Sequence, residues 1–297
     1  MRIAVTGSTG FVGTPLVRRL QTAGHTVLRI GRARPGGAPP DVTWDAATTL
    51  DASKLEGVDA VVHLAGESIA QRWSAQAKRA IRDSREHGTT LLATTLARLA
   101  QKPAVLVSMS ATGIYGNRGD ETLDESSSLG DGFLADVGRC WESSADAARA
   151  AGIRVVHPRL GIVLSPDGGA LAKMLPIFSL GAGGTIGSGR QWMSWISRTD
   201  VLRAFELMLL TPSLDGPVNL TAPGAVTNAE FTGVLGKVMH RPTFAPVPEF
   251  AIKLLFGEMG EATVIQGQRV APRELLAAGF SFLHPVLETA LRAEGVR

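Results

Sequence analysis

Short apolar segments alternate with longer stretches of helical periodicity through the first half of the chain. Strands are expected at 3–5, 26–30, 60–64, 105–108 and 153–156. Helices are expected near 11–23, 74–100 and 133–151. Ser74 is the expected N-cap of the second helix, and Gly152 the end of the third. This alternation predicts an α/β fold, a Rossmann-type doubly wound parallel sheet with its ligand crevice at the carboxyl ends of the strands.

Beyond Gly161 the pattern changes. A glycine-rich segment is expected to form a loop over the crevice, after which a helix at 199–210 and a strand at 217–220 return to the sheet. From Thr227 onward the chain reads as helices separated by turns. The apolar spacing of FAIKLLFGEM at 250–259 predicts a helix packed in the core rather than a membrane or partner surface.

A chain of 297 residues, 44% of them hydrophobic, suits one large domain with a smaller appendage. We expect a dinucleotide-binding Rossmann domain at 1–165 that is rejoined by 197–222, a crevice loop at 166–196, and a small, mostly helical substrate or lid domain at 223–297. The stretch RARPGGAPP at 32–40 is expected to be a surface loop.

Charge and cysteine content narrow the class of protein. The formal net charge is +3 and the basic residues are scattered, so a nucleic-acid partner is not expected. Cys140 is the only cysteine, which excludes an internal disulfide and gives no sign of a cysteine-rich metal site. No apolar run is long enough to cross a bilayer. We therefore expect a soluble, cytoplasmic protein without a membrane partner.

The segment VTGSTGFVG at 5–13 places Gly7, Gly10 and Gly13 at equal spacing between a strand and a helix. A phosphate approaches a backbone closely only where side chains are absent, and a helix N-terminus offers free N–H groups and a positive dipole end. The spacing departs from the more familiar Gly-x-Gly-x-x-Gly, so a tight turn without a ligand remains an alternative.

The end of the second strand bears on cofactor selectivity. A carboxylate there holds the ribose 2′-hydroxyl of NAD, whereas an arginine accommodates the 2′-phosphate of NADP. No acidic residue occurs before Asp41, and Arg32 follows the strand directly. Arg32 therefore favours NADP, with Arg29 and Arg34 as less favoured helpers, although Arg32 as an ordinary loop residue stays open.

Three segments, VTGSTGFVG, VVHLAGESI at 61–69 and SMSATGIYG at 108–116, resemble the extended short-chain dehydrogenase/reductase superfamily. More closely, the chain is similar to its atypical branch of nucleoside-diphosphate-sugar epimerase-like proteins, which end in a small helical domain. That branch is indicated by LAGE (64–67), RWS (72–74), FLADVGRCWE (133–142), LSPDGGALAKMLP (164–176), GSGRQWMSWI (187–196), TNAEF (227–231) and GQRVAP (267–272).

The resemblance implies an NADP site. The contacts that it implies are Gly7, Thr9, Gly10, Phe11, Val12, Gly31, Arg32, Leu64, Ala65, Arg85 and Val163. Small and apolar residues at a strand end suit the adenosine and ribose, and an arginine suits a phosphate. The alternative for Arg85 is a surface arginine paired with Asp83 or Glu86.

The proton relay that the superfamily uses is missing. Its members carry a Tyr-x-x-x-Lys pair on one helix face, where the lysine charge lowers the tyrosine pKa. Tyr115 is the only tyrosine, and Gly119 stands four residues later. On the helix expected to carry the pair, Leu134 and Gly138 occupy the two places.

Three residues remain as catalytic candidates. Ser110 best matches the superfamily's assisting serine, Tyr115 would need a nearby cation to act as an acid, and Glu67 would need burial to act as an acid or base. Structural roles for all three remain open. His63 is expected to be a hydrogen-bonded core residue more often than a ligand contact.

The loop bearing Gln191, Trp192 and Trp195 has two interpretations: these residues stack a planar ligand, or they fix the loop to the core. Asp200 is expected to be an acid at a helix N-terminus.

Two functions are compatible with the whole chain. One is an NADP-dependent, epimerase-like oxidoreductase for a small polar substrate, and the other is a non-catalytic NADP(H)-binding sensor or regulator. A homodimer through the helices at 74–100 and 133–151 is possible by analogy with the superfamily.

Overall fold

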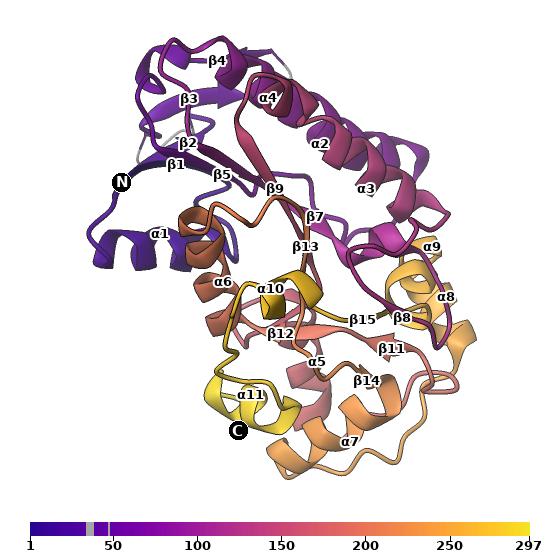
Figure 1. Ribbon diagram of the computed structural model, residues 1–297. Coiled ribbons are helices and arrows are strands. Elements are labelled where there is room, and N and C mark those ends of the chain that lie inside the picture. The colour runs from indigo at the N-terminus through magenta and orange to yellow at the C-terminus, as the bar shows by residue number, and fades with distance from the viewer. Residues whose placement is uncertain (34–38, 47) are drawn as a thin grey trace.

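A mostly parallel sheet forms the centre of the upper lobe in the computed structural model, which describes residues 1–33, 39–46 and 48–297 (Figure 1). In these residues the strand order is β13-β9-β6-β5-β1-β2-β3-β4, with β7 beside β9. The strands are β1 (Arg2–Thr6), β2 (Thr26–Gly31), β3 (Val42–Asp45), β4 (Thr49–Leu50), β5 (Ala60–His63), β6 (Val105–Ser108), β7 (Ser110–Ala111), β9 (Arg154–Leu160) and β13 (Gly216–Leu220). All paired neighbours are parallel except β3 and β4.

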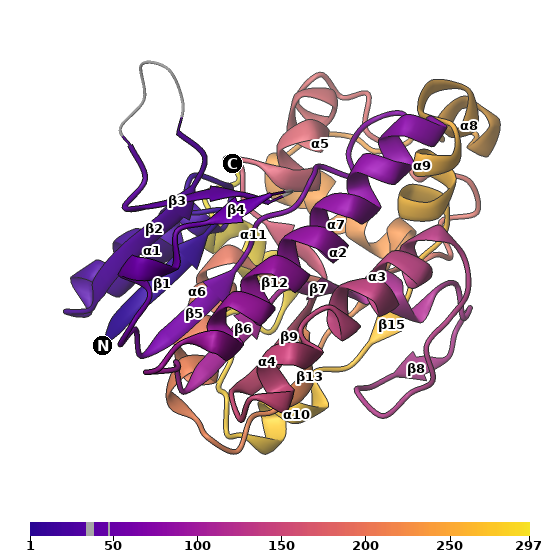
Figure 2. The ribbon, with the colours of Figure 1, turned by 90° about the horizontal axis from the view of Figure 1, so that it is seen from above.

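Helices cover both faces of this sheet (Figures 1 and 2). They are α1 (Gly13–Thr22) and α6 (Arg198–Leu210) on one face, and α2 (Ala75–Arg98), α3 (Phe133–Ser143) and α4 (Asp146–Ala150) on the other. Successive residues of a strand point to opposite faces, so Ile3 and Val5 pack with α1 and α6, whereas Ala4 packs with α2 and α4. This two-sided burial explains why β1 reads as a continuous apolar run.

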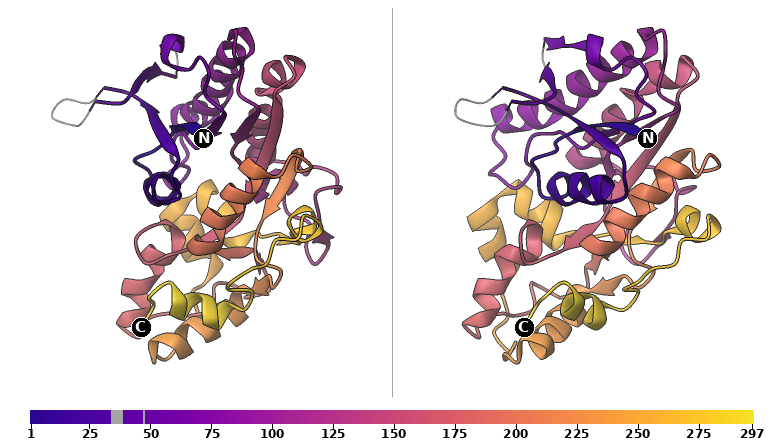
Figure 3. Two further views of the ribbon diagram at one scale, coloured as in Figure 1. Left: turned by 60° about the vertical axis from the view of Figure 1, so that its left-hand side comes forward. Right: turned by 90° about the vertical axis from the view of Figure 1, so that its left-hand side faces the viewer.

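The lower lobe has its own core and surrounds three short strand pairs (Figure 3). The pairs are β10 (Ile162–Leu164) with β12 (Trp195–Ser197), β11 (Trp192–Met193) with β14 (Val226–Thr227), and β8 (Thr122–Leu123) with β15 (Arg269–Val270). The other elements are α5 (Gly169–Ser179), α7 (Asn228–Met239), α8 (Glu249–Phe256), α9 (Glu258–Gly260), α10 (Arg273–Ala277), α11 (Leu287–Ala293), the 3-10 helices η1 (Ala52–Lys54) and η2 (Thr112–Tyr115), and the π-helical η3 (Glu261–Ile265).

The fold class predicted from the sequence is confirmed, and so is the N-cap of α2, where the Ser74 hydroxyl accepts a hydrogen bond from the Ala77 amide. The strands β3 and β4 were not predicted. The prediction of core packing for 250–259 is wrong, because Phe250 and Leu254 of α8 are 71% and 73% exposed. The loop predicted at 32–40 lies partly outside the described residues.

Asp200 begins α6 as a fully buried acid. Its carboxylate accepts hydrogen bonds from the Leu283 and His284 amides, at 2.9 and 3.0 Å, and from Arg203 at 2.9 Å. The residue therefore serves the N-terminal role that the sequence predicts, and it also fixes the C-terminal segment to α6. Across the described residues, no helix is both long and apolar enough to cross a bilayer.

Candidate functional site

The glycine turn lies between β1 and α1, at the carboxyl edge of the sheet. Gly7 has a φ of 64°, and a Cβ on Gly13 would lie 2.1 Å from the Gly7 carbonyl oxygen. The helix therefore packs against the turn more closely than any side chain permits. Among the described residues, the backbone amides of Phe11 and Val12 donate to no protein group. These amides and the N-terminus of α1 form a cradle for an anion.

The loop between β10 and α5 lies against this cradle. A Cβ on Gly168 would lie 2.5 Å from Cδ2 of Phe11, so the loop backbone is in contact with the aromatic ring. Arg198 holds the loop through a 2.6 Å ion pair with Asp167, and its guanidinium lies 5.8 Å from the Phe11 ring centre. Val163 is buried in β10, directly before the loop, whereas Thr9 is exposed in the turn. The structure thus brings most of the residues expected at the phosphates into one region.

The second wall of this region is the end of β5. The Thr6 hydroxyl accepts hydrogen bonds from the amides of Leu64 and Ala65, at 3.0 and 3.2 Å. It also lies 2.7 Å from Nδ1 of His63, whose Nε2 is 3.0 Å from the Thr89 hydroxyl. Burial lowers the pKa of His63 to about 4, so the ring is neutral, and this network is satisfied when Nδ1 accepts and Nε2–H donates. His63 is the core histidine that the sequence favoured.

The low pKa of His63 makes stability depend on pH. A folded-state pKa below the usual value means that the unfolded chain binds the proton more readily, so stability is full near pH 7 and falls as the pH drops toward 4. We expect this residue to account for about 3 kcal/mol of that loss. Melting curves between these pH values measure it. His63→Asn should be the less pH-sensitive protein, and equal slopes for the two would contradict the assignment.

Arg85 of α2 is a largely desolvated cation. Its guanidinium donates to the carbonyl oxygens of Glu67 (2.9 Å) and Ile81 (3.0 Å) and lies 4.7 Å from the Trp141 ring centre. No carboxylate within the described residues forms an ion pair with it, which excludes the expected alternative of Asp83 or Glu86. Burial lowers the pKa of Arg85 to about 10, so it stays charged at neutral pH. The Glu67 carboxylate acts on Arg85 only from beyond ion-pair distance, so this desolvated cation is suited to an anionic ligand.

The end of β2 is open. Arg32 is exposed after Gly31, with no protein partner among the described residues, and a Cβ on Gly31 would meet only the Pro40 side chain, at 4.0 Å. Arg29 instead forms a 3.1 Å ion pair with Asp41. Arg29 is therefore engaged, and Arg34 lies outside the described residues. Within 1–33 and 39–46, Arg32 is the arginine near this strand end that has no carboxylate partner.

Tyr115 is not placed as a crevice acid. It is fully buried in η2, where its hydroxyl donates to Oδ1 of Asn219 at 2.7 Å and accepts from Arg159 at 2.9 Å. The cation that a tyrosine acid would need is thus present, but Arg159 is already bound by both oxygens of Glu142, at 2.8 and 2.9 Å. Burial outweighs the cation and raises the pKa of Tyr115. In this position Tyr115 joins η2 to β9 and β13, and an acid role for it stays a prediction.

Ser110 is also buried, with 1% of its surface exposed. Its hydroxyl makes no hydrogen bond of normal geometry to any described residue. It nevertheless lies near Glu142, where Arg159 lowers the pKa of the carboxyl and Ser110 adds a smaller lowering effect. An unpaired buried hydroxyl is unfavourable. The Ser110 hydroxyl therefore faces Glu142 from a buried position, and a substrate would reach it only after the surrounding protein moves.

The remaining candidate, Glu67, is exposed, so the burial that acid–base catalysis would need is absent. On α3, Leu134 lies against Gly113, and a Cβ on Gly138 would lie 2.8 Å from Cγ1 of Ile114. The close packing of α3 on η2 leaves no room for a lysine at 138. Ser110 and Tyr115 thus lie at the buried pair of Arg159 and Glu142, whereas Glu67 is exposed on the loop after β5.

The tryptophans fix loops to the rest of the molecule. Trp195 is fully buried, and the Trp192 indole donates to Asp120 at 2.8 Å while Arg269 lies 4.4 Å from its ring centre. Gln191 donates to two backbone carbonyls. All three residues are engaged in protein contacts, which favours the structural alternative.

Comparison with known proteins shows the family of the chain. The family model for the NAD dependent epimerase/dehydratase family matches residues 3–220. The chain belongs to that family. A second model, a domain of unknown function (DUF1731), matches residues 247–294, so the family's glycine turn is combined here with a small C-terminal domain.

Individual relatives of the family cover nearly the whole chain. An epimerase family protein of Mycobacterium tuberculosis, MT2273, is 44% identical over 97% of this chain and 96% of its own length. The crystal structure of human epimerase family protein SDR39U1 with NADPH has a TM-score of 0.89 and 34% identity, covering 99% of this chain and 98% of that one. A nucleoside-diphosphate sugar epimerase from Corynebacterium glutamicum has a TM-score of 0.81 and 33% identity, and this chain covers 58% of it.

The sequence did not single out the buried ion pair of Arg159 with Glu142, or Asn219 beside it. Arg159 was noted only as a strand end, and Glu142 only as part of a family segment. A charged residue within the apolar run of β9 is the signal that could have revealed the pair, because a buried charge requires a partner.

Proposed function

We propose that this chain is an NADP(H)-dependent, epimerase-like oxidoreductase that acts on a small polar substrate. The observation that carries the proposal is the cradle, in which Gly13 touches Gly7 and the amides of Phe11 and Val12 are free. The NADPH in the human relative's structure supports the choice of cofactor. The residues of the cradle fit a pyrophosphate. A pyrophosphate binds where no side chain separates it from the backbone and where N–H groups can donate to its oxygens.

The protein's own residues would divide the work of binding. Phe11 and Val12 donate backbone N–H groups to the pyrophosphate, Arg85 provides a cation, and Arg32 selects the 2′-phosphate. Leu64 and Ala65 offer a small apolar wall held by Thr6. The cofactor, when bound, supplies or accepts a hydride. Ser110 would orient a substrate oxygen once uncovered, and water would exchange the proton, since Glu142, the buried carboxyl beside Ser110, is held ionised by Arg159 and is no proton donor.

Cofactor handling tests the proposal. The purified protein is titrated with NADPH and NADH, beside Arg32→Ala, and bound NADPH is followed while pooled metabolites are added. We expect NADPH to bind at least about 10-fold more tightly than NADH, with the preference reduced in the variant. Failure to bind either nucleotide would refute the proposal.

Replacement of Arg85 tests the anionic ligand directly. Arg85→Met is expected to weaken NADPH binding by about 10- to 100-fold, because a charge-assisted contact contributes about 1.5–3 kcal/mol. Isothermal titration measures the change. Arg79→Met, an exposed arginine of the same helix, is the matched control and should bind NADPH as the unaltered protein does. If the two variants bind equally well, Arg85 is not a phosphate contact.

The alternative function is a non-catalytic NADP(H)-binding sensor. The burial of both Ser110 and Tyr115 favours it, because neither hydroxyl is presented to a substrate. The titration separates the two functions. NADPH that binds and is oxidised when metabolites are added supports the oxidoreductase, whereas tight binding without any oxidation supports the sensor.

A further inference from the structure

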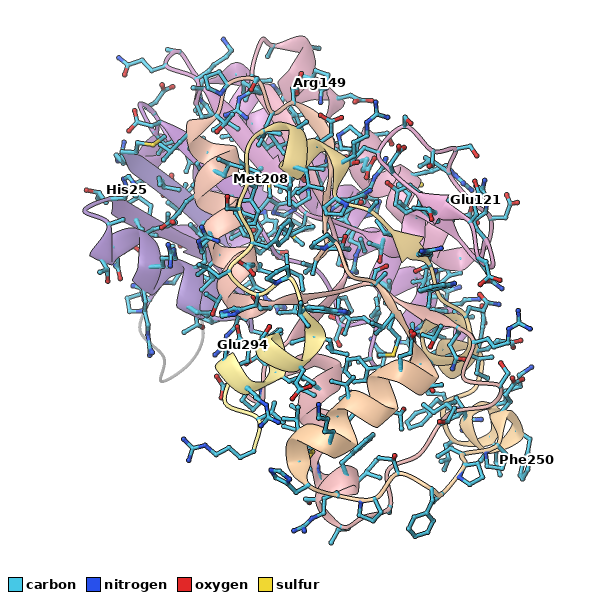
Figure 4. All side chains as sticks on the ribbon, turned by 60° about the horizontal axis from the view of Figure 1, so that its bottom comes forward. His25, Glu121, Arg149, Met208, Phe250 and Glu294 are labelled. Carbon is cyan, nitrogen blue, oxygen red and sulfur yellow. The ribbon has the colours of Figure 1, made fainter. Side chains whose placement is uncertain are left out.

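One apolar surface on the lower lobe is not used by the site. It is formed by α8, the end of α5 and the segment between α7 and α8, and we call it the α8 surface. Its exposed side chains are Ile177, Leu180, Phe244, Phe250, Leu254, Leu255 and Phe256, with exposed fractions from 41% to 83%. Phe250 projects outward from the edge of the molecule (Figure 4).

The parts of the α8 surface are joined. Gly181 lies against Pro242, Gly184 bridges to Phe244, and Ile186 bridges to Val247. The segments that carry these apolar side chains are therefore adjacent in space from the end of α5 to the start of α8. Within α8 only Ile252 is buried, so the helix presents its apolar side chains to the outside.

The size of the α8 surface is that of a protein interface. Each of its seven large side chains exposes on the order of 100 Å², which gives roughly 700 Å² in total. The largest apolar patch on a typical monomer is about 300–600 Å². A standard interface covers about 800 Å² on each partner. The α8 surface alone therefore provides what one half of such an interface requires.

Charges at the two ends of the α8 surface are complementary to each other. Arg241 lies at the α5 end, where it donates to the Ser179 carbonyl oxygen at 2.9 Å, and Glu249 begins α8. Neither side chain forms an ion pair within the described residues. Lys253, in contrast, is already paired with Glu261 at 3.0 Å. In a two-fold arrangement, the α8 end of one copy meets the α5 end of the other, which brings opposite free charges together at both contacts.

We propose that the α8 surface is the interface of a homodimer of this chain, with α8 of each copy lying against the α5 end of its partner. The analogy with the superfamily instead suggests the helices α2, α3 and α4 as the interface. They are poorer candidates, because no exposed large apolar side chain of the described residues lies on them. The inference does not depend on the proposed function.

Sedimentation velocity over a range of protein concentrations tests the dimer. The unaltered protein is expected to be dimeric at roughly micromolar concentration, and the double variant Phe250→Glu, Leu254→Glu to raise the dissociation constant at least about 10-fold. Leu210→Glu is the matched control, since Leu210 is a 62% exposed apolar residue at the end of α6, outside the α8 surface. It should dimerise normally.

Folding of the double variant is checked by its melting curve and by NADPH affinity, since neither residue touches the cradle. A protein that stays monomeric at every concentration would overturn the proposal, as would a dimer that the double variant leaves intact. Monomers that float with phospholipid vesicles through the same two residues would also overturn it, because a lipid surface would then be the occupant.

Discussion

Gly13→Ala is expected to disable the glycine turn. The added Cβ would lie 2.1 Å from the Gly7 carbonyl oxygen and 3.0 Å from Cα of Ser8, and both atoms belong to backbone that cannot rotate away. The helix α1 must then move off β1, at a cost of about 3 kcal/mol of folding stability. Because the amides of Phe11 and Val12 move with α1, NADPH affinity should fall at least about 100-fold.

Thermal unfolding and NADPH titration measure the two effects. Gly233→Ala is the control, because Gly233 lies in α7 with no atom within 4 Å of the added Cβ. Alanine is the better helix former, so this variant should be more stable by about 0.5–1 kcal/mol and bind NADPH normally. Unchanged NADPH affinity in Gly13→Ala would show that the cradle does not hold the cofactor.

Arg159→Leu is expected to destabilise the fold by about 3–5 kcal/mol, because it leaves the Glu142 carboxylate in a buried place without its cation. The side chains of Arg159 and Glu142 are only 5% and 15% exposed. Adding Glu142→Leu should recover much of the loss, since a paired removal leaves no isolated charge. Denaturant unfolding of the single and double variants measures both.

The same pair sets a pH dependence. Arg159 holds the pKa of Glu142 below its usual value, despite the opposing effect of burial, so the carboxylate contributes stability above the unfolded-state pKa that is lost as the pH falls through the lower folded one. The effect of Arg159→Leu should therefore shrink in acid. Lys237→Met is the control, because it breaks the surface ion pair with Glu288, in which the two side chains are 68% and 31% exposed. This variant should lose less than about 1 kcal/mol of folding stability at any pH. A similar small loss in Arg159→Leu would contradict the buried-pair account.

The local pattern of residues was sufficient to predict the central sheet and the glycine turn. β1, β5 and β6 are apolar runs between helices, and the spacing of Gly7, Gly10 and Gly13 is a constraint between near neighbours. β3 was missed because VTWD is four residues long and alternates buried with exposed positions at one side of the sheet. Short apolar and polar alternation of that length does not distinguish a strand from a loop.

Side-chain environment was harder to predict because it depends on distant parts of the chain. Tyr115 is buried by contacts with Asn219, 104 residues away, and Arg159, 44 residues away. Nothing near position 115 in the sequence indicates these partners. The spacing of α8 similarly defines an apolar face, but only the path of the chain decides whether another element covers it.

The path of the chain between the two lobes affects how the protein responds to proteolysis and to thermal unfolding. The chain leaves the sheet after β9, returns for α6 and β13, leaves again at β14, and comes back with α10, whose Leu275 packs in the core of α1 and α6. No single cut therefore yields one lobe as an uninterrupted polypeptide. A protease that nicks the segment between α7 and α8 would leave both fragments held in place, and heating should melt the two lobes in one cooperative step.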